Sequence, residues 1–318
     1  MTKKNKDTHV YQHKIPQVYM KYWSHLKDKD KRVYVYETSE VKKSLIRSRY
    51  ESSIQGKKSM FEVDDVSTST VGGENDFYTI FKDSFICNEE DKKRIESGEI
   101  RILDIENNLS KIENKWTSIA DGIINNTSNN KKLLKEFKKK EIIYFTMTMY
   151  FRGNKGVEKM KDLLIDLILN PNLSTNLNNQ YREILTEILK EEEKFSKEFL
   201  LNELRKLFDN EGLIYKLYKL IEENCTIIFS RAKGNIKFIT SDNPSLKAKI
   251  KDKGEVITMA VTPNIIIDIV LNSERNKQYK VFDLDDKGVI NFNQMIFENS
   301  KEFVISNVSN IFDSIATK

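Results

Sequence analysis

The chain has 318 residues, of which 39% are hydrophobic, and this is enough to build a sizeable core in one large domain or two small ones. Its 53 basic and 48 acidic side chains leave a formal charge of +5, which permits contact with nucleic acid without demanding it. The two cysteines, Cys87 and Cys225, are too few for a disulfide framework, so we expect two reduced thiols in the core.

The sequence favours a cytoplasmic location without a membrane partner. The charged start of the chain is not followed by the apolar region of a signal peptide. No run approaches the ~18 apolar residues that a membrane-spanning helix needs. The chain also lacks clustered His and Cys residues, so we expect no structural zinc site and no metal ligands. The cofactor and the oligomeric state stay open.

The first 80 residues predict short strands and helices. Pro16 suits a first helical turn, and the aromatic residues that follow it up to Trp23 would pack on one side of that helix. Residues 32–37 alternate like a strand, and residues 59–63 form a second candidate. Residues 71–78 predict a turn that feeds a short helix.

The middle of the chain is predicted to be helical. Apolar residues recur at steps of three and four in one stripe of a long helix: Ile102, Ile105, Leu109, Ile112, Trp116, Ile119 and Ile123. A loop is expected at residues 125–130, followed by a helix over 131–152 whose last turns are apolar all round. We expect that helix to be buried at the centre of the protein. Further helices are predicted over 157–169 and, in two pieces broken near residues 209–212, over 178–224.

The last third returns to strands. Residues 226–230 and 236–240 predict a hairpin, and residues 256–261 and 265–270 predict two more strands. A helix near 291–299, a strand at 303–306 and a terminal helix follow. We therefore predict an α+β fold with a largely helical middle and a small antiparallel sheet built from N-terminal and C-terminal strands. The chain is expected to be one domain over 1–318, with regions 8–80, 100–224 and 225–318.

The first polar segment of interest is Gln-His-Lys-Ile-Pro-Gln-Val-Tyr at residues 12–19. A histidine just ahead of a helix meets unpaired N–H groups and the positive end of the helix dipole. This setting favours the neutral imidazole, so His13 is a candidate base or metal ligand. The alternative is that His13 only caps the helix or packs against it.

The second segment is Thr-Ser-Asp-Asn-Pro at residues 240–244, where an apolar strand ends. Polar groups at a strand end are well placed to face a cleft. Asp242 is a candidate to orient His13, to accept a proton or to bind a cation. The alternative is an Asx-turn, in which Asp242 only bonds nearby backbone N–H groups. Ser241 does not lie in a GxSxG elbow, which gives no support to hydrolase chemistry of that kind.

Arg152 and Glu74 complete the candidate site. A guanidinium at the end of a buried helix needs an anionic partner, which would be Asp242, Glu74 or a phosphate or carboxylate of a ligand. Glu74 follows two glycines, and Glu74 or Asp76 is alternatively a cap of the next helix. The glycines match neither the P-loop pattern nor GxGxxG.

Taken together and in this order, these segments resemble the bacterial family called "domain of unknown function 4238". The resemblance rests on the segment around residues 12–19, an Asp-Phe-Tyr block at 76–78, a helix ending at Arg152, Thr-Ser-Asp-Asn-Pro at 240–244 and Ala-Val-Thr-Pro at 260–263. It covers nearly the whole chain. Lys14 stands where the family has an aromatic residue, and Met149 stands where it has Gln. The resemblance supports the choice of site residues and does not imply an activity.

We predict catalytic roles for His13, Asp242, Arg152 and Glu74, and substrate contacts for Gln12, Tyr19, Ser241 and Asn243. The leading hypothesis is a nucleic-acid-processing, nuclease-like enzyme, such as a bacterial defence or toxin-type effector. In it His13 would be the general acid or base and Arg152 would neutralise a phosphoryl group. One alternative is a non-enzymatic module that binds a ligand or nucleic acid, and another is a nucleotide-modifying hydrolase. The candidate partners are therefore nucleic acid and nucleotides.

Overall fold

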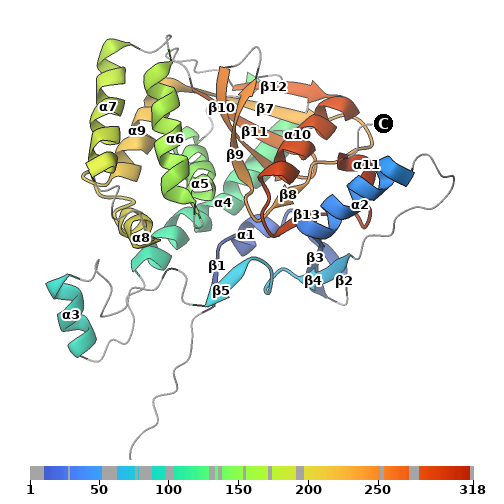
Figure 1. Cartoon of the computed structure of the whole chain (residues 1–318), viewed down its shortest axis with the longest axis horizontal. Coiled ribbons are helices and arrows are strands. Elements are labelled where there is room, and N and C mark those ends of the chain that lie inside the picture. Colours follow the sequence, from blue (N-terminus) through green and yellow to red (C-terminus); the bar gives the residue numbers. More distant parts are fainter. Residues whose placement is uncertain are drawn as a thin grey trace, which may run out of the picture.

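The computed structural model describes residues 11–27, 29–51, 63–75, 78, 88–97, 104–128, 133–134, 138–152, 155–170, 174–190, 197–250, 254–271 and 279–315. Within these ranges the fold is α+β, as predicted, and helices fill the middle of the chain (Figure 1). The predicted strand at 59–63 and the short helix expected after residue 78 lie largely outside the described residues.

The predicted sheet of N-terminal and C-terminal strands is confirmed. It joins β2 (His25–Lys27), β3 (Asp30–Glu37) and β4 (Asp64–Ser67) to β8 (Thr240–Ser241) and β13 (Phe303–Ser306). The central pair is β3 and β13, which run antiparallel with Tyr36 opposite Val304. Strand β13 also pairs with β8, so the sheet brings the Thr-Ser-Asp-Asn-Pro segment beside the start of the chain.

In the described part of the chain, a larger sheet of six strands forms from five strands of the C-terminal third and one strand of the helical middle; it was not predicted as a separate sheet. Its order is β6 (Leu133–Leu134), β12 (Tyr279–Leu284), β7 (Cys225–Ala232), β11 (Ile265–Leu271), β10 (Gly254–Thr262) and β9 (Ser245–Ile250). Strands β12 and β7 are parallel, whereas the other pairs are antiparallel. Strands β10 and β11 match the predicted strands, and their residues are buried almost throughout.

The predicted hairpin of residues 226–230 and 236–240 is wrong. Strand β7 pairs with β11 and β12, and residues 236–239 belong to no strand. Their backbone is held by side chains instead, because Ile236 N–H donates to Asp286 and Ile239 N–H donates to Asn293. The apolar alternation arises from packing on α10 (Asp286–Asn299), where Phe238 meets Phe292 edge to face.

From Ile105 onward, the predicted apolar stripe lies on α4 (Asp104–Ser128), and Ile102 lies outside the described residues. The stripe residues on this helix are buried: Ile105, Leu109, Ile112, Trp116, Ile119 and Ile123. The helix continues to Ser128, into the loop predicted over 125–130, because Asn126 and Thr127 bond back to the carbonyls of Gly122 and Ile123. Such bonds let polar residues stay inside a helix.

The central buried helix is α5 (Lys139–Phe151), in which all residues from Ile142 to Phe151 are buried. This confirms the prediction of its burial, although the helix begins at Lys139 and not at residue 131. Phe145 stacks on Trp116 of α4 with ring centroids 3.8 Å apart. The same helix packs against β9 and β10 of the large sheet, so it links the helical middle to the strands.

The helices that directly follow α5 in the chain pack beside it and beside one another (Figure 1). Helix α6 (Gly156–Leu169) matches its prediction, while the region predicted as two helices holds three: α7 (Thr175–Lys190), α8 (Lys197–Arg205) and α9 (Leu213–Asn224). The N-terminus of α9 is capped from α8, because Leu213 N–H donates to Glu203. Short or peripheral elements are α1 (Gln17–Met20), α2 (Thr38–Glu51), α3 (Glu89–Glu96), α11 (Phe312–Ile315) and the strand pair of β1 (Tyr11–His13) with β5 (Gly73–Asn75).

Candidate functional site

His13 and Glu74 lie in the two-stranded ribbon of β1 and β5. Its register places Gln12 opposite Glu74 and His13 opposite Gly73. His13 Nε2 lies 3.0 Å from the carbonyl oxygen of Ser69 and 3.3 Å from Gln17 Nε2. Glu74 forms an ion pair with Lys14 Nζ at 2.7 Å. The contacts of His13 and Glu74 described here are thus with residues in or near the ribbon.

Gln12 and Arg152 meet at Tyr78, although they are far apart in sequence. The Tyr78 N–H donates to Gln12 Oε1 at 2.5 Å, and Arg152 Nε donates to the Tyr78 hydroxyl at 3.1 Å. Arg152 Nη2 forms an ion pair with Glu113 of α4 at 2.7 Å. We call Gln12, Tyr78, Glu106, Glu113 and Arg152 the inner polar cluster. The anionic partner of Arg152 is thus Glu113, and not Asp242 or Glu74.

Burial and neighbouring charges act against each other on the pKa values of the inner polar cluster, and Tyr78, Glu106 and Arg152 each end with a raised pKa. Burial raises the pKa of the Tyr78 hydroxyl, although Arg152 opposes this shift. Burial also raises the pKa of the Glu106 carboxyl. For Arg152, burial favours loss of the proton, but Tyr78 and Glu113 outweigh it and raise the pKa of the guanidinium. Arg152 is therefore a permanent buried cation with internal partners.

Tyr19, predicted to contact substrate, lies fully inside the core. Its hydroxyl lies 2.8 Å from Thr240 Oγ1 and donates to the carbonyl oxygen of Ala260 at 2.7 Å. These bonds link α1 to β8 and β10. The side chain thus joins three segments of the family pattern without reaching the surface.

Asp242 closes the turn that follows α10. Its carboxylate accepts hydrogen bonds from the N–H groups of Lys301 and Glu302, at 3.0 and 3.2 Å, and from Asn243 Nδ2 at 3.2 Å. Burial raises the pKa of the Asp242 carboxyl, while these backbone donors oppose the shift. The bonded amides lie 59 and 60 residues away, so the contact is long-range and differs from the local Asx-turn considered as the alternative. The neighbouring Ser241 is buried, and its Oγ accepts from Asn243 N–H.

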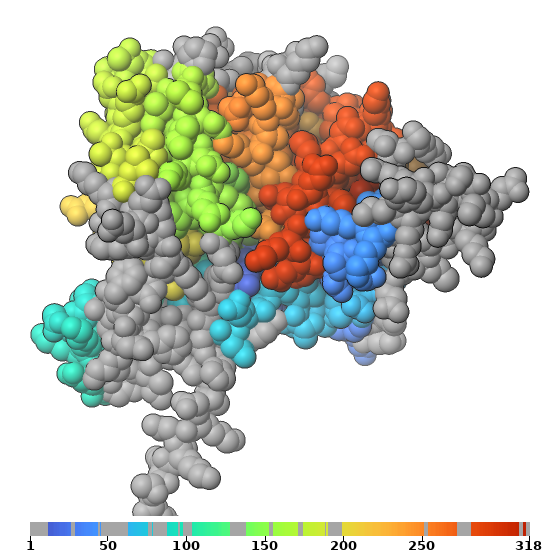
Figure 2. Space-filling view, viewed as in Figure 1, coloured from blue at the N-terminus to red at the C-terminus, as the bar shows by residue number. Residues whose placement is uncertain are grey.

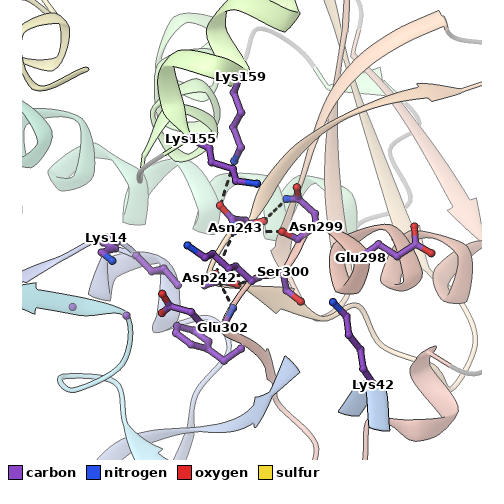
Figure 3. A pocket seen from close by; sticks show the side chains of 15 residues that line it. Lys14, Lys42, Lys155, Lys159, Asp242, Asn243, Glu298, Asn299, Ser300 and Glu302 are labelled. Carbon is purple, nitrogen blue, oxygen red and sulfur yellow. Dashed lines mark hydrogen bonds between the residues drawn. The ribbon is translucent and has the colours of Figure 1, made fainter. Parts of the chain in front are cut away.

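Asp242 and Asn243 line a pocket of about 440 Å³, which we call the lysine pocket (Figure 3). Five of its lining residues are lysines, carried by the segment after β1, by α2, by the start of α6 and by the turn after α10: Lys14, Lys42, Lys155, Lys159 and Lys301. The view in Figure 3 shows Lys155 and Lys159 reaching toward Asn243 from α6, with Lys14 on another side. On the face shown in Figure 2, the C-terminal residues in red lie between α6 in green and α2 in blue.

The floor of the lysine pocket is held by paired amides. Asn243 Nδ2 donates to the carbonyl oxygen of Asn299, and Asn299 Nδ2 donates to that of Asn243. Lys159 Nζ donates to Asn243 Oδ1 at 3.3 Å. Burial lowers the pKa of Lys159 to about 8, with Lys155 adding to the shift and Asp242 opposing it.

The eight predicted site residues are thus divided among the β1–β5 ribbon, the inner polar cluster, the core around Tyr19 and the lysine pocket. Asp242 and Asn243 line the lysine pocket, whereas His13, Arg152 and Ser241 are not among its lining residues. Sequence reasoning missed Lys155, Lys159 and Asn299. One signal was present in the sequence: Lys155 and Lys159 are spaced by four residues, and this spacing places both on one face of a helix.

The makeup of the described residues also bears on the kind of site. They contain no group of three or more His, Cys, Asp or Glu side chains arranged to hold a metal ion. None of the helices in the described part of the chain combines the length and the apolar character needed to cross a bilayer.

The chain belongs to the family DUF4238, described as "Protein of unknown function", whose model matches residues 11–310. This confirms the resemblance seen in the sequence, and the match includes both the inner polar cluster and the lysine pocket. Neither the curated proteins nor the solved structures yielded a significant match.

Proposed function

We propose that the protein is a binding module for a phosphorylated ligand of nucleotide size, and that the lysine pocket is its binding site. The observation that carries this proposal is the gathering of five lysines from four separate segments around one hollow. The three carboxylates of the lining, Asp242, Glu298 and Glu302, leave a formal charge of +2. A concave surface with excess positive charge attracts anions.

The size of the pocket favours a small ligand. Small-molecule sites usually span roughly 300–1,000 Å³, and this one has about 440 Å³. A nucleic-acid duplex needs a long basic stripe along the protein surface. A single nucleotide, or the phosphorylated end of a strand, needs only a compact basic pocket. Asn243 and Asn299 add amide groups able to select the orientation of such a ligand.

The bonds of Asp242 favour binding over catalysis. Its carboxylate already accepts hydrogen bonds from Lys301, Glu302 and Asn243, so its geometry suits the shaping of the pocket wall. A general base needs a free lone pair within reach of the proton that it takes. Asp242 in this role fixes Lys301 and Asn243 at the pocket.

Equilibrium titration with inorganic phosphate, nucleoside monophosphates and nucleoside triphosphates tests the proposal. We expect binding that weakens as salt is raised, because the attraction is between charges. Lys155→Met and Lys159→Met should each weaken binding about tenfold, the effect of losing one charge-assisted hydrogen bond. Lys161→Met is the matched control, since Lys161 lies on the same helix but does not line the pocket. Equal loss in the control, or absence of phosphate binding by the unaltered protein, would contradict the proposal.

The second candidate is an enzyme that processes nucleic acid or nucleotides, including a nuclease-like defence effector. The observation in its favour is that Lys159 and Asp242, two pocket groups of opposite type, both have shifted pKa values. Such shifts gather at catalytic sites, although structural networks also produce them. A turnover screen on RNA, DNA and nucleotides with the unaltered protein, His13→Ala and Asp242→Asn separates the candidates. Turnover that disappears in either folded variant would favour the enzyme.

A further inference from the structure

Lys159 differs from the other lysines of the pocket in its surroundings. Its side chain is partly buried at the first turn of α6, and its Nζ donates to Asn243 Oδ1. The ammonium also lies over the ring of Tyr150, 5.2 Å from its centroid. The amine is thus held at a fixed place in the pocket wall, with an amide oxygen to orient it.

The charges around Lys159 include both cations and anions. Lys155 lies one turn earlier on the same helix, at the N-cap of α6. The other charged residues that line the pocket are Lys14, Lys42, Lys301, Asp242, Glu298 and Glu302. Desolvation together with a neighbouring cation favours the neutral amine, which is the nucleophilic form of lysine. Burial, aided by Lys155, outweighs the attraction of the Asp242 carboxylate, so the pKa of Lys159 falls to about 8.

We propose that Lys159 captures a phosphorylated aldehyde or ketone as an imine, while the neighbouring lysines of the pocket hold the phosphate group. The inference rests on the proposed function, because it assigns the phosphate to Lys155 and its neighbours in the same pocket. It goes further by naming the second group of the ligand, a carbonyl carbon within reach of Lys159 Nζ. Enzymes that form imines use lysines activated in this way, by desolvation or by a nearby cation.

The step balances without any oxidant or reductant. Neutral Nζ attacks the carbonyl carbon, a C–N bond forms, and the carbonyl oxygen takes up a proton to give a carbinolamine. That hydroxyl then takes up a second proton from solvent or from the Lys155 ammonium and leaves as water, while the nitrogen lone pair forms the C=N bond. Nζ has given up both of its hydrogens as protons, so the sum is one amine and one carbonyl converted to one neutral imine and one water.

Pyridoxal 5′-phosphate, reduced in place with cyanoborohydride, is the probe for this capture. Peptide mapping should find most of the label on Lys159. Removing the phosphate from the probe should lower the labelling of Lys159 relative to Lys161 at least about tenfold, the effect expected from one lost charge-assisted contact. Lys159→Arg should lose the preferred site and take label only at the background rate of the other lysines, whereas Lys161→Arg should be labelled as the unaltered protein is. Circular dichroism checks that both variants are folded.

The outcomes separate the two proposals. Label spread evenly over surface lysines, in a protein that still binds inorganic phosphate, would overturn the imine and leave the proposed function standing. A ratio of Lys159 to Lys161 labelling that is the same with pyridoxal and with its phosphate would overturn the proposed ligand class. Absence of phosphate binding would overturn the proposed function itself. A labelling rate at Lys159 that rises with a midpoint near pH 8, while surface lysines react only nearer pH 10, would support the inference.

Discussion

The positive charge of Lys159 suits anion binding, but its burial lowers the free energy of unfolding. The folded pKa is about 8 and the ordinary value is 10.5, so between these values the unfolded chain binds more protons than the folded one. The free energy of unfolding therefore rises with pH over this window, and below pH 8 the protein carries the whole cost of burying the ammonium.

We expect Lys159→Met to be more stable than the unaltered protein at pH 7, by about 1–2 kcal/mol after allowance for partial solvation. The difference should shrink as the pH rises from 8 to 10.5. Urea unfolding at several pH values measures it, with Lys155→Met as the exposed control that should change little. A Lys159→Met protein less stable than the control at pH 7 would show that the pocket stabilises the charged lysine.

The sequence pointed to the right segments of the candidate site but not to the contacts of each residue. Asp242 and Asn243 were recognised because polar residues follow an apolar strand. Their partners could not be predicted, because Lys301 and Glu302 approach through the pairing of β8 with β13. The same holds for Arg152, whose need for an anion was predicted while its partner, Glu113, lies on a helix that the sequence showed only as an apolar stripe.

At the scale of elements, the turn before β5 determines where one wall of the pocket lies. Gly72 has a φ of +65°, and its carbonyl oxygen accepts from Lys14 N–H at 2.8 Å. A Cβ at Gly72 would lie 3.1 Å from Ile15 Cδ1, whereas Gly254, with a φ of +76°, has open space around it. Both glycines thus adopt a positive φ, but only at Gly72 would an added Cβ be crowded by a neighbouring side chain.

Gly72→Ala should lower the free energy of unfolding by more than the about 1–2 kcal/mol that the left-handed backbone alone costs. Gly254→Ala, the matched control, should show only that backbone cost. Because Gly72 holds the segment of Lys14, only its variant should also weaken phosphate binding. Urea unfolding and phosphate titration of both variants measure these effects, and equal losses in both would refute a special role for the Gly72 turn.

Elements with a strong period were predicted well, and elements defined by long-range pairing were not. The stripe of α4, the apolar α5 and the strands β10 and β11 carry their pattern in adjacent residues. Residues 236–239 show why alternation alone can mislead, since packing on α10 produces the same apolar spacing as a strand. The helix predicted from residue 131 begins later because residues 133–134 pair with β12, which lies about 145 residues further along the chain.

At the scale of the molecule, the inner polar cluster and the core join the N-terminal ribbon to the helices. The prediction of a single domain can be tested with the two tryptophans, Trp23 after α1 and Trp116 on α4, both fully buried. We expect Trp23→Phe and Trp116→Phe to give fluorescence transitions in urea that each coincide with the loss of helical circular dichroism. A separate transition seen by one tryptophan alone would indicate two domains.

The pairing of β3 with β13 has a consequence for synthesis on the ribosome. About 270 residues separate Tyr36 from Val304, its partner across the sheet. At roughly 5–20 residues per second, the nascent β3 waits on the order of tens of seconds for that partner to emerge. Until then its edge is exposed to other chains, which is a hazard for aggregation. Chaperone dependence during translation should therefore be greatest before β13 leaves the exit tunnel.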